Sequence, residues 1–340
     1  MQNIGEPIEI EEDILENTLR PRKFKEYIGQ EKTKDALRVF VEAAKIRKEP
    51  LEHILFYGPP GLGKTTLAHV MASETGSNLK ITSGPAIERA GDLVSILTSL
   101  EESDIIFIDE IHRLGKVVEE ILYPAMEDYA VDIVVGKGPG AKTLRVDLPK
   151  FTLIGATTRI SLLSSPMRDR FGIIHALDFY SDDEIGKILE RSSKILDIKI
   201  DQQSVKEIAK RARKTPRIAN RLLKRVRDFA TVYEQGVAGL DITSKALSDI
   251  GVDHLGLDET DRKYLSTLLH KFDGGPVGVE TLSAATSIDR NTIEEVIEPY
   301  LMQIGFIKRT PKGRMTTPAC DINFVPHQSN YGGAKTKENL

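Results

Sequence analysis

Apolar and polar positions follow two different periods along residues 19–180. Short apolar runs, such as Ile54-Leu55-Phe56-Tyr57 and Ile105-Ile106-Phe107-Ile108, predict buried strands. Between such runs, apolar residues recur with the period of a helix. In residues 31–48, for example, they fall at Leu37, Phe40, Val41 and Ala44. Strands that alternate with helices favour an α/β domain with a parallel sheet, and we assign residues 19–180 to it.

Residues 181–253 show only helical patterns. Ser181 and Glu184 form a capping box that predicts a first helix. Ser204 and Glu207 predict a second, and Thr215-Pro216 places proline at the first position of a third. We therefore expect a small all-α domain here.

Residues 254–325 predict helices at 261–271, 279–286 and 289–303, followed by two short strands around a Pro311-Lys312-Gly313 turn. Three helices and a two-stranded wing are typical of a winged helix-turn-helix.

Residues 131–148 predict a hairpin inserted into the first domain. Its apolar side chains either pack on their own domain or form a partner surface. Residues 1–18 are expected to be a flexible leader and residues 326–340 a disordered tail.

Composition narrows the class of protein. A chain of 340 residues suits two or three domains, and no apolar run approaches the length of a membrane span. The polar, acidic N-terminus does not resemble a secretory signal, and a single cysteine, Cys320, excludes an intramolecular disulfide or a cysteine-rich zinc site. We therefore expect a cytoplasmic protein that does not bind membranes. A basic run at 206–227 predicts a solvated helix face or a binding surface.

The strongest chemical signal is a phosphate-binding loop. Residues Gly58-Pro59-Pro60-Gly61-Leu62-Gly63-Lys64-Thr65 match G-x-x-x-x-G-K-[ST] at every fixed position. Glycines let backbone N–H groups point inward at phosphates, Lys64 supplies a positive charge, and the Thr65 hydroxyl is a magnesium ligand. The loop lies between a predicted strand and a predicted helix, which is the context that this motif requires.

A second motif ends the apolar run at 105–108 with Asp109 and Glu110. We expect Asp109 to hold magnesium and Glu110 to orient or activate the attacking water. Together with the loop, these carboxylates predict a site for ATP, Mg²⁺ and a water molecule.

Several motifs in combination resemble the RuvB family of AAA+ motors, which drive Holliday-junction branch migration. They are Leu19-Arg20-Pro21, Tyr27-Ile28-Gly29-Gln30, the phosphate loop, the string from Ile108 to Leu114, Gly155-Ala156-Thr157-Thr158-Arg159, the string from Ser165 to Gly172, and the string from Thr215 to Leu223. The resemblance extends from about residue 19 to residue 318. It implies a P-loop AAA+ ATPase core, a small all-α lid domain and a C-terminal winged helix-turn-helix domain.

The resemblance also implies roles for particular residues. Thr158 would be a first sensor, Arg170 an arginine finger that acts on the neighbouring subunit, and Arg217 a second sensor. Lys64, Asp109 and Glu110 would complete the catalytic set, with Thr65 and Asp109 on the metal. The nucleotide would contact Leu19, Arg20, Tyr27, Ile28, Gly61, Leu62, Gly63, Lys64, Thr65, Thr66, Glu127, Asp128, Tyr129, Tyr180, Pro216 and Arg217.

Partners follow from the same resemblance. The family acts on double-stranded DNA at four-way junctions as a homo-hexamer with RuvA and RuvC, and the hairpin at 131–148 would dock RuvA. Arg290, Arg309 and Arg314 would contact the DNA backbone. Where the family's wing usually has two arginines around a glycine, this chain has Lys312-Gly313-Arg314. Lysine keeps the charge without the planar fork, so Arg314 is the stronger candidate.

Other classes of function remain as alternatives. A clamp-loader-type or other DNA-remodelling AAA+ ATPase would share the core, but a clamp loader carries a helical collar in place of a winged helix. A transcription regulator would need base-reading side chains, and Glu294 and Glu295 oppose the approach of phosphate. The string Asp109-Glu110-Ile111-His112 also suggests a DExH helicase, which would need a second motor domain that this chain does not repeat.

Overall fold

The computed structural model describes residues 18–135 and 142–324, so the predicted leader (apart from Thr18) and tail lie outside the described residues. The chain divides into two compact units, residues 1–250 and 251–340. The first contains the α/β core and the helical region that follows it. The second contains the winged helix.

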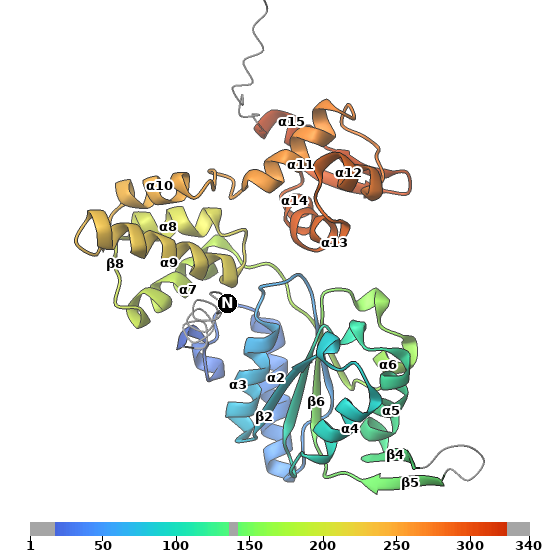
Figure 1. Cartoon of the computed structure of the whole chain (residues 1–340). Coiled ribbons are helices and arrows are strands. Elements are labelled where there is room, and N and C mark those ends of the chain that lie inside the picture. The colour runs from blue at the N-terminus through green and yellow to red at the C-terminus, as the bar shows by residue number, and fades with distance from the viewer. Residues whose placement is uncertain (1–17, 136–141, 325–340) are drawn as a thin grey trace, which may run out of the picture. The chain divides into compact units, whose positions relative to one another are not determined.

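A five-stranded parallel sheet forms the centre of the first unit, in the order β2-β3-β6-β1-β7 (Figure 1). The predicted strands around the motifs are confirmed: β1 (Ile54–Tyr57) ends at the phosphate loop, and β3 (Ile105–Asp109) ends at the acid pair. Because all strands run in one direction, both motifs reach the same edge of the sheet. The remaining strands are β2 (Leu79–Ser83), β6 (Thr152–Thr157) and β7 (Ile173–Ala176).

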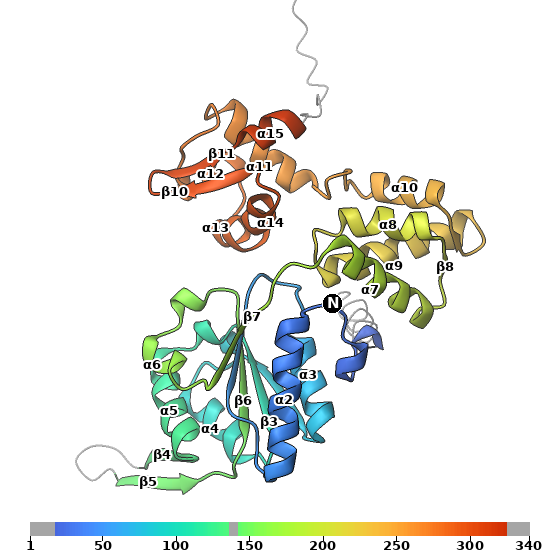
Figure 2. The ribbon, with the colours of Figure 1, turned by 180° about the vertical axis from the view of Figure 1, so that it is seen from behind.

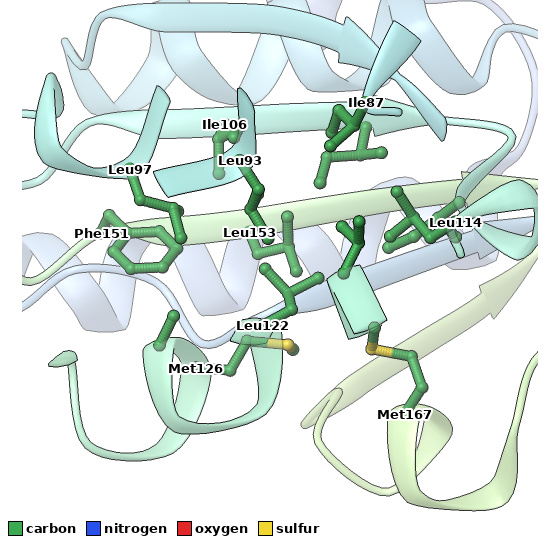
Figure 3. Close-up of a cluster of buried hydrophobic side chains, with 14 of the residues drawn as sticks. Ile87, Leu93, Leu97, Ile106, Leu114, Leu122, Met126, Phe151, Leu153 and Met167 are labelled. Carbon is green, nitrogen blue, oxygen red and sulfur yellow. The ribbon is translucent and has the colours of Figure 1, made fainter. Parts of the chain in front are cut away.

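Helices cover both faces of this sheet. α2 (Glu31–Arg47) and α3 (Lys64–Thr75) lie on one face, while α4 (Ala90–Thr98) and α5 (Lys116–Glu127) lie on the other (Figures 1 and 2). Figure 3 shows the apolar core between the sheet and α4 and α5, where Leu93, Leu122 and Leu153 meet and are fully buried. This core fixes the strand ends that carry the site. Shorter helical elements are η1 (Phe24–Glu26), η2 (Gly84–Ala86), η3 (Ile111–Arg113), η5 (Ile160–Leu162) and α6 (Ser165–Arg168).

The inserted hairpin is present as β4 (Ala130–Val135) paired antiparallel with β5 (Lys142–Asp147), and its predicted turn lies outside the described residues. Its base packs on its own domain, since Val131 and Leu148 are buried in the same apolar core as Leu122 and Phe151. Leu144, further along β5, is 55% exposed. The base of the hairpin therefore packs on its own domain, while a partner surface on its exposed part stays a prediction.

The helical region contains α7 (Asp182–Ile195), β8 (Lys199–Ile200), α8 (Gln202–Arg211), α9 (Pro216–Tyr233), β9 (Val237–Ala238) and α10 (Leu240–Asp249). The capping box at Ser181 is confirmed. The second predicted capping box was wrong, because the Asp201 carboxylate caps α8 by accepting from the Ser204 N–H at 2.7 Å. Basic residues of the 206–227 run lie on α8 and α9, and Arg211, Arg225 and Arg227 pair with nearby acids.

The second unit has the predicted winged helix. α11 (Glu259–His270) and α12 (Val279–Thr286) precede a third helical stretch, and β10 (Ile307–Thr310) pairs antiparallel with β11 (Gly313–Thr316). The third stretch was predicted as one helix, but a π-helical segment, η6 (Ile293–Ile297), separates α13 (Arg290–Thr292) from α14 (Glu298–Gln303). Pro299 explains the interruption, because it has no N–H for the i→i−4 bond. α15 (Pro318–Asn323) closes this unit.

Within the described part of the chain, none of the helices combines the length and the apolar character that crossing a bilayer requires.

Candidate functional site

The phosphate loop curls because its glycines adopt backbone angles that side chains resist. Gly58, Gly61 and Gly63 have φ values of 140°, 79° and 99°. A Cβ on Gly63 would also lie 2.7 Å from the Tyr27 hydroxyl. The loop then opens directly into α3, whose N-terminus begins at Lys64. This geometry aims backbone N–H groups and the positive end of the helix at one point, which is an anion site.

A pocket opens in front of this loop. Its walls include most of the residues expected to hold a nucleotide: Leu19, Arg20, Tyr27, Ile28, Gly61, Gly63, Lys64, Thr65, Thr66, Asp109, Glu110, Tyr180, Pro216 and Arg217. These residues come from the N-terminal segment, the loop, β3, and the helical region. The structure therefore brings together positions that span almost 200 residues of sequence.

Lys64 lies in the floor of this pocket with its ammonium group largely buried. Nζ donates hydrogen bonds to the carbonyl oxygens of Gly58 at 2.8 Å and Pro59 at 3.0 Å. Burial lowers the pKa of Lys64, while the negative charges of Asp109 and Glu110 act in the opposite direction. The ammonium thus stands beside the acid pair, where it would meet the terminal phosphates of a bound nucleotide.

The acid pair differs in environment between its two members. Asp109 Oδ1 accepts the Glu110 backbone N–H at 2.9 Å, and burial raises the pKa of Asp109. Glu110 Oε2 accepts from Thr158 Oγ1 at 3.1 Å and lies 3.2 Å from His112 Nδ1. Burial alone would raise the pKa of Glu110, but the contacts with His112 and Thr158 outweigh it, so this pKa is lowered. Glu110 is therefore held as a carboxylate, as a base requires.

The hydroxyl groups of two tyrosines contact the phosphate loop. The hydroxyls of Tyr27 and Tyr180 lie 3.1 Å apart, and both donate to the backbone carbonyl of Leu62, at 3.4 Å and 3.1 Å. Burial raises the pKa of Tyr180 to about 12 and that of Tyr27 well above its usual value, so both remain neutral donors. Leu62 itself is fully buried and lines no part of the pocket; its expected nucleotide contact is available only through its backbone.

Seven residues that line the pocket were not predicted as site residues. Pro21, Pro60 and Asn220 belong to the quoted motifs but were given no contact, whereas Glu26 and, on α7, Ile188, Arg191 and Ser192 lie outside every motif. Arg191 Nη1 donates to the Leu19 carbonyl at 2.6 Å, and Ser192 Oγ donates to Asn220 at 2.7 Å. Arg191 and Ser192 belong to no sequence motif, because they are polar residues on an amphipathic helix. Only their spacing after the capping box at Ser181 could have indicated that they face the pocket.

Arg170 and the segment Glu127, Asp128 and Tyr129 do not line this pocket. Glu127 Oε1 lies 3.1 Å from Arg170 Nη2, Asp128 pairs with Arg145, and the Tyr129 ring packs edge-on against Phe151. Glu127, Asp128 and Tyr129, which were expected to contact the nucleotide, therefore lie away from this chain's own pocket, as Arg170 does.

The three arginines expected at DNA all have acidic partners within the winged helix. Arg314 Nε donates to Glu298 at 2.8 Å and its Nη2 to Glu294 at 2.9 Å, and Arg309 also binds Glu298. The Glu298 side chain is fully buried. Burial alone would lower the pKa of Arg314, but the hydrogen bonds and charges of these acids raise it. Arg290 pairs with Glu280 and Glu294 at the surface.

Arg314→Ala is expected to lower the free energy of unfolding of the winged helix by about 3 kcal/mol, because it removes one cation from a buried carboxylate. Arg290→Ala is the matched control and should cost less than about 1 kcal/mol, since the Arg290 side chain is 55% exposed and water screens its charge. Hydrogen exchange of α11 amides in the full chain measures both. Equal protection in the two variants would contradict the structural role of Arg314.

Together, the parallel sheet, the phosphate loop with its acid pair, the helical lid and the winged helix define a P-loop AAA+ ATPase with a DNA-binding domain. Family models agree along the chain: "Holliday junction DNA helicase RuvB P-loop domain" matches residues 19–177, "RuvB AAA lid domain" residues 180–253, and "RuvB C-terminal winged helix domain" residues 254–321. The chain belongs to the RuvB family of ATP-driven branch-migration motors.

Solved structures support this assignment. The Thermotoga maritima RuvB Holliday junction branch migration motor is 49% identical, with a TM-score of 0.82, over 89% of this chain and 97% of that one. The K64R mutant of Thermotoga maritima RuvB is 50% identical, with a TM-score of 0.83, over 89% of this chain and 96% of that one. The fold class predicted from the sequence, a P-loop domain followed by a lid and a winged helix, is thereby confirmed.

Proposed function

We propose that this chain hydrolyses ATP in a homo-hexameric ring and uses each hydrolysis step to move the arms of a four-way DNA junction, together with RuvA and RuvC. The observation that carries the proposal is a nucleotide pocket that contains its own base, Glu110, but not Arg170. If Arg170 takes part in hydrolysis, it must therefore act on the nucleotide of a second copy of the chain.

Magnesium fits the residues of this pocket. The Thr65 hydroxyl and the Asp109 carboxylate both line it, and these are oxygen donors of the kind that Mg²⁺ prefers. No group of three or more histidine, cysteine, aspartate or glutamate side chains in the described ranges could hold a metal by itself. That is expected for an ion that takes one or two protein ligands and completes its shell with phosphate and water. When bound, Mg²⁺ would neutralise charge on the phosphates.

Three residues of this chain would take part in ATP hydrolysis. Lys64 would exchange its bonds to the loop carbonyls for the terminal phosphates, since it already lies at the loop's centre. Glu110 would accept a proton from the attacking water, and Thr158 would hold the carboxylate in place through its 3.1 Å hydrogen bond. The water must enter between Glu110 and the γ-phosphate for an in-line attack.

Arg170 would reach the nucleotide of the adjacent subunit and stabilise charge on the transferring phosphoryl group. The segment Glu127, Asp128 and Tyr129 would face the same neighbouring nucleotide, because Glu127 pairs with Arg170 outside this chain's own pocket.

The lid would respond to nucleotide through Arg217 and Pro216. The Arg217 N–H donates to the Gly61 carbonyl at 3.5 Å, so the first turn of α9 touches the phosphate loop. A cation in the first turn of a helix opposes the helix dipole, which favours a role in binding an anion. Tyr180 joins the core to the lid at the same place, since its N–H donates to the Lys214 carbonyl.

The partner surfaces follow the family. The exposed side chain of Leu144 would give RuvA an apolar contact on the hairpin, whose base is anchored in the core. Arg290, Arg309 and Arg314 would contact DNA phosphates, although each would then share its charge with Glu280, Glu294 or Glu298. A DNA substrate also favours a cytoplasmic location. The alternative of a clamp-loader-type ATPase is disfavoured by the winged helix.

Dissociation of a synthetic four-way junction tests this proposal. With ATP, Mg²⁺ and RuvA, the protein should separate the junction into two duplexes, and omission of RuvA should slow the reaction. Glu110→Gln should not support it. Separation by the Glu110→Gln variant, or indifference of the wild type to the presence of a junction, would refute the motor.

A further inference from the structure

Three groups on the surface of the α/β core hold the Arg170 side chain. Its Cζ lies 4.2 Å from the centroid of the Tyr123 ring on α5, well within the range of a cation–π contact. Nη1 donates to the Pro166 carbonyl at 2.6 Å, and Nη2 lies 3.1 Å from Glu127 Oε1. Nε is buried without a hydrogen-bond partner in the part of the chain that the structure describes.

The contacts differ in strength. The Glu127 side chain is 56% exposed, so water screens its ion pair with Arg170. Tyr123 lies on a helix that is fixed in place, because Leu122 and Met126 on the same helix are buried in the core of Figure 3. Its hydroxyl is also fixed, since it donates to Glu119 at 3.0 Å and lies 3.2 Å from Ser164 Oγ. Tyr123 is therefore the rigid contact of Arg170, and the exposed Glu127 carboxylate is the contact that can change position.

We propose that Tyr123 is a positioning residue that presents the Arg170 guanidinium to the neighbouring subunit through the face of its ring. The proposal rests on the trans-acting role of Arg170 proposed above. An arginine side chain has large rotamer freedom, and stacking one face of its guanidinium on a fixed ring removes much of that freedom before the reaction. The exposed Glu127 carboxylate can then release Nη2 to the neighbouring nucleotide while the ring contact remains. A group oriented in advance stabilises the transition state without reorganisation at that moment.

Two substitutions separate the ring from the hydroxyl. Tyr123→Phe keeps the ring face and removes the bonds to Glu119 and Ser164. Tyr123→Leu removes the face. In junction- and RuvA-stimulated hydrolysis by the full-length protein, we expect Tyr123→Leu to lower kcat about tenfold with little change in KM, and Tyr123→Phe to stay within about twofold. Tyr123→Met, another apolar side chain without a π face, replaces the leucine variant if that variant does not fold or assemble.

The Arg170→Ala background decides whether Tyr123 acts through Arg170. If it does, adding Tyr123→Leu there lowers kcat no further, since the group that the ring positions is already absent. A further tenfold loss would overturn the inference, while the loss in Arg170→Ala alone would still support the trans-acting arginine. Equal losses in the phenylalanine and leucine variants, or none in either, would also overturn it. Full turnover in Arg170→Ala would overturn both proposals.

Discussion

Arg170→Ala is expected to lower ATP turnover by the assembled protein by about 10³–10⁵-fold, the range found for arginines that act in trans on phosphoryl transfer. Nucleotide binding should remain, because Arg170 lines no part of the chain's own pocket. Steady-state hydrolysis with junction DNA and RuvA measures the turnover, and equilibrium dialysis against ATP measures the binding.

Arg168→Ala is the matched control for that experiment. Arg168 lies two residues earlier, at the end of α6, and its Nη2 donates locally to Ser165 Oγ at 2.9 Å. We expect its removal to change turnover by less than about threefold, as for a surface contact. Equal losses in the two variants would indicate that this segment is important for structure and not for catalysis.

Glu110→Gln is expected to lower turnover by about 10²–10⁴-fold while leaving ATP affinity nearly unchanged, since general-base catalysis contributes that much. Glutamine has the same shape and can still accept the hydrogen bond from Thr158 Oγ1, so the pocket should keep its geometry. What it loses is the carboxylate, whose pKa the contacts with His112 and Thr158 hold low despite burial. Single-turnover hydrolysis and ATP binding, measured on the same preparation, separate the two effects.

The control for Glu110→Gln is Glu101→Gln, at an exposed position just before the same strand, which should leave turnover intact. Unchanged turnover in Glu110→Gln would remove this glutamate from the mechanism. Loss of ATP binding would instead indicate that its charge is needed to build the site.

The centre of the site could be predicted from the sequence because its signals are local. A phosphate loop needs a strand before it and a helix after it, and β1 (Ile54–Tyr57) and α3 (Lys64–Thr75) follow from adjacent residues. The acid pair at the end of β3 then reaches the same edge because parallel strands share their carboxyl ends. The winged helix could likewise be predicted from local signals, namely the helical periodicity of its helices and the turn between its two strands.

Features that depend on distant contacts could not be predicted. Arg191 enters the pocket only because α7 packs beside the N-terminal segment and donates to Leu19. The pairing of Arg314 with the buried Glu298 joins residues on a strand and a helix, and no local pattern indicates it. The same holds for Tyr123 beneath Arg170, since an aromatic residue at helical spacing is usually a core residue.

The claim that the catalytic site is shared between two copies is tested most directly by mixing two inactive variants. Lys64→Ala removes the pocket's own cation, and Arg170→Ala removes the arginine given to the neighbour. In rings formed from an equal mixture, about one interface in four pairs an intact Lys64 with an intact Arg170. We predict that junction-stimulated hydrolysis recovers to roughly a quarter of the wild-type rate. A mixture as inactive as its two components would contradict the account.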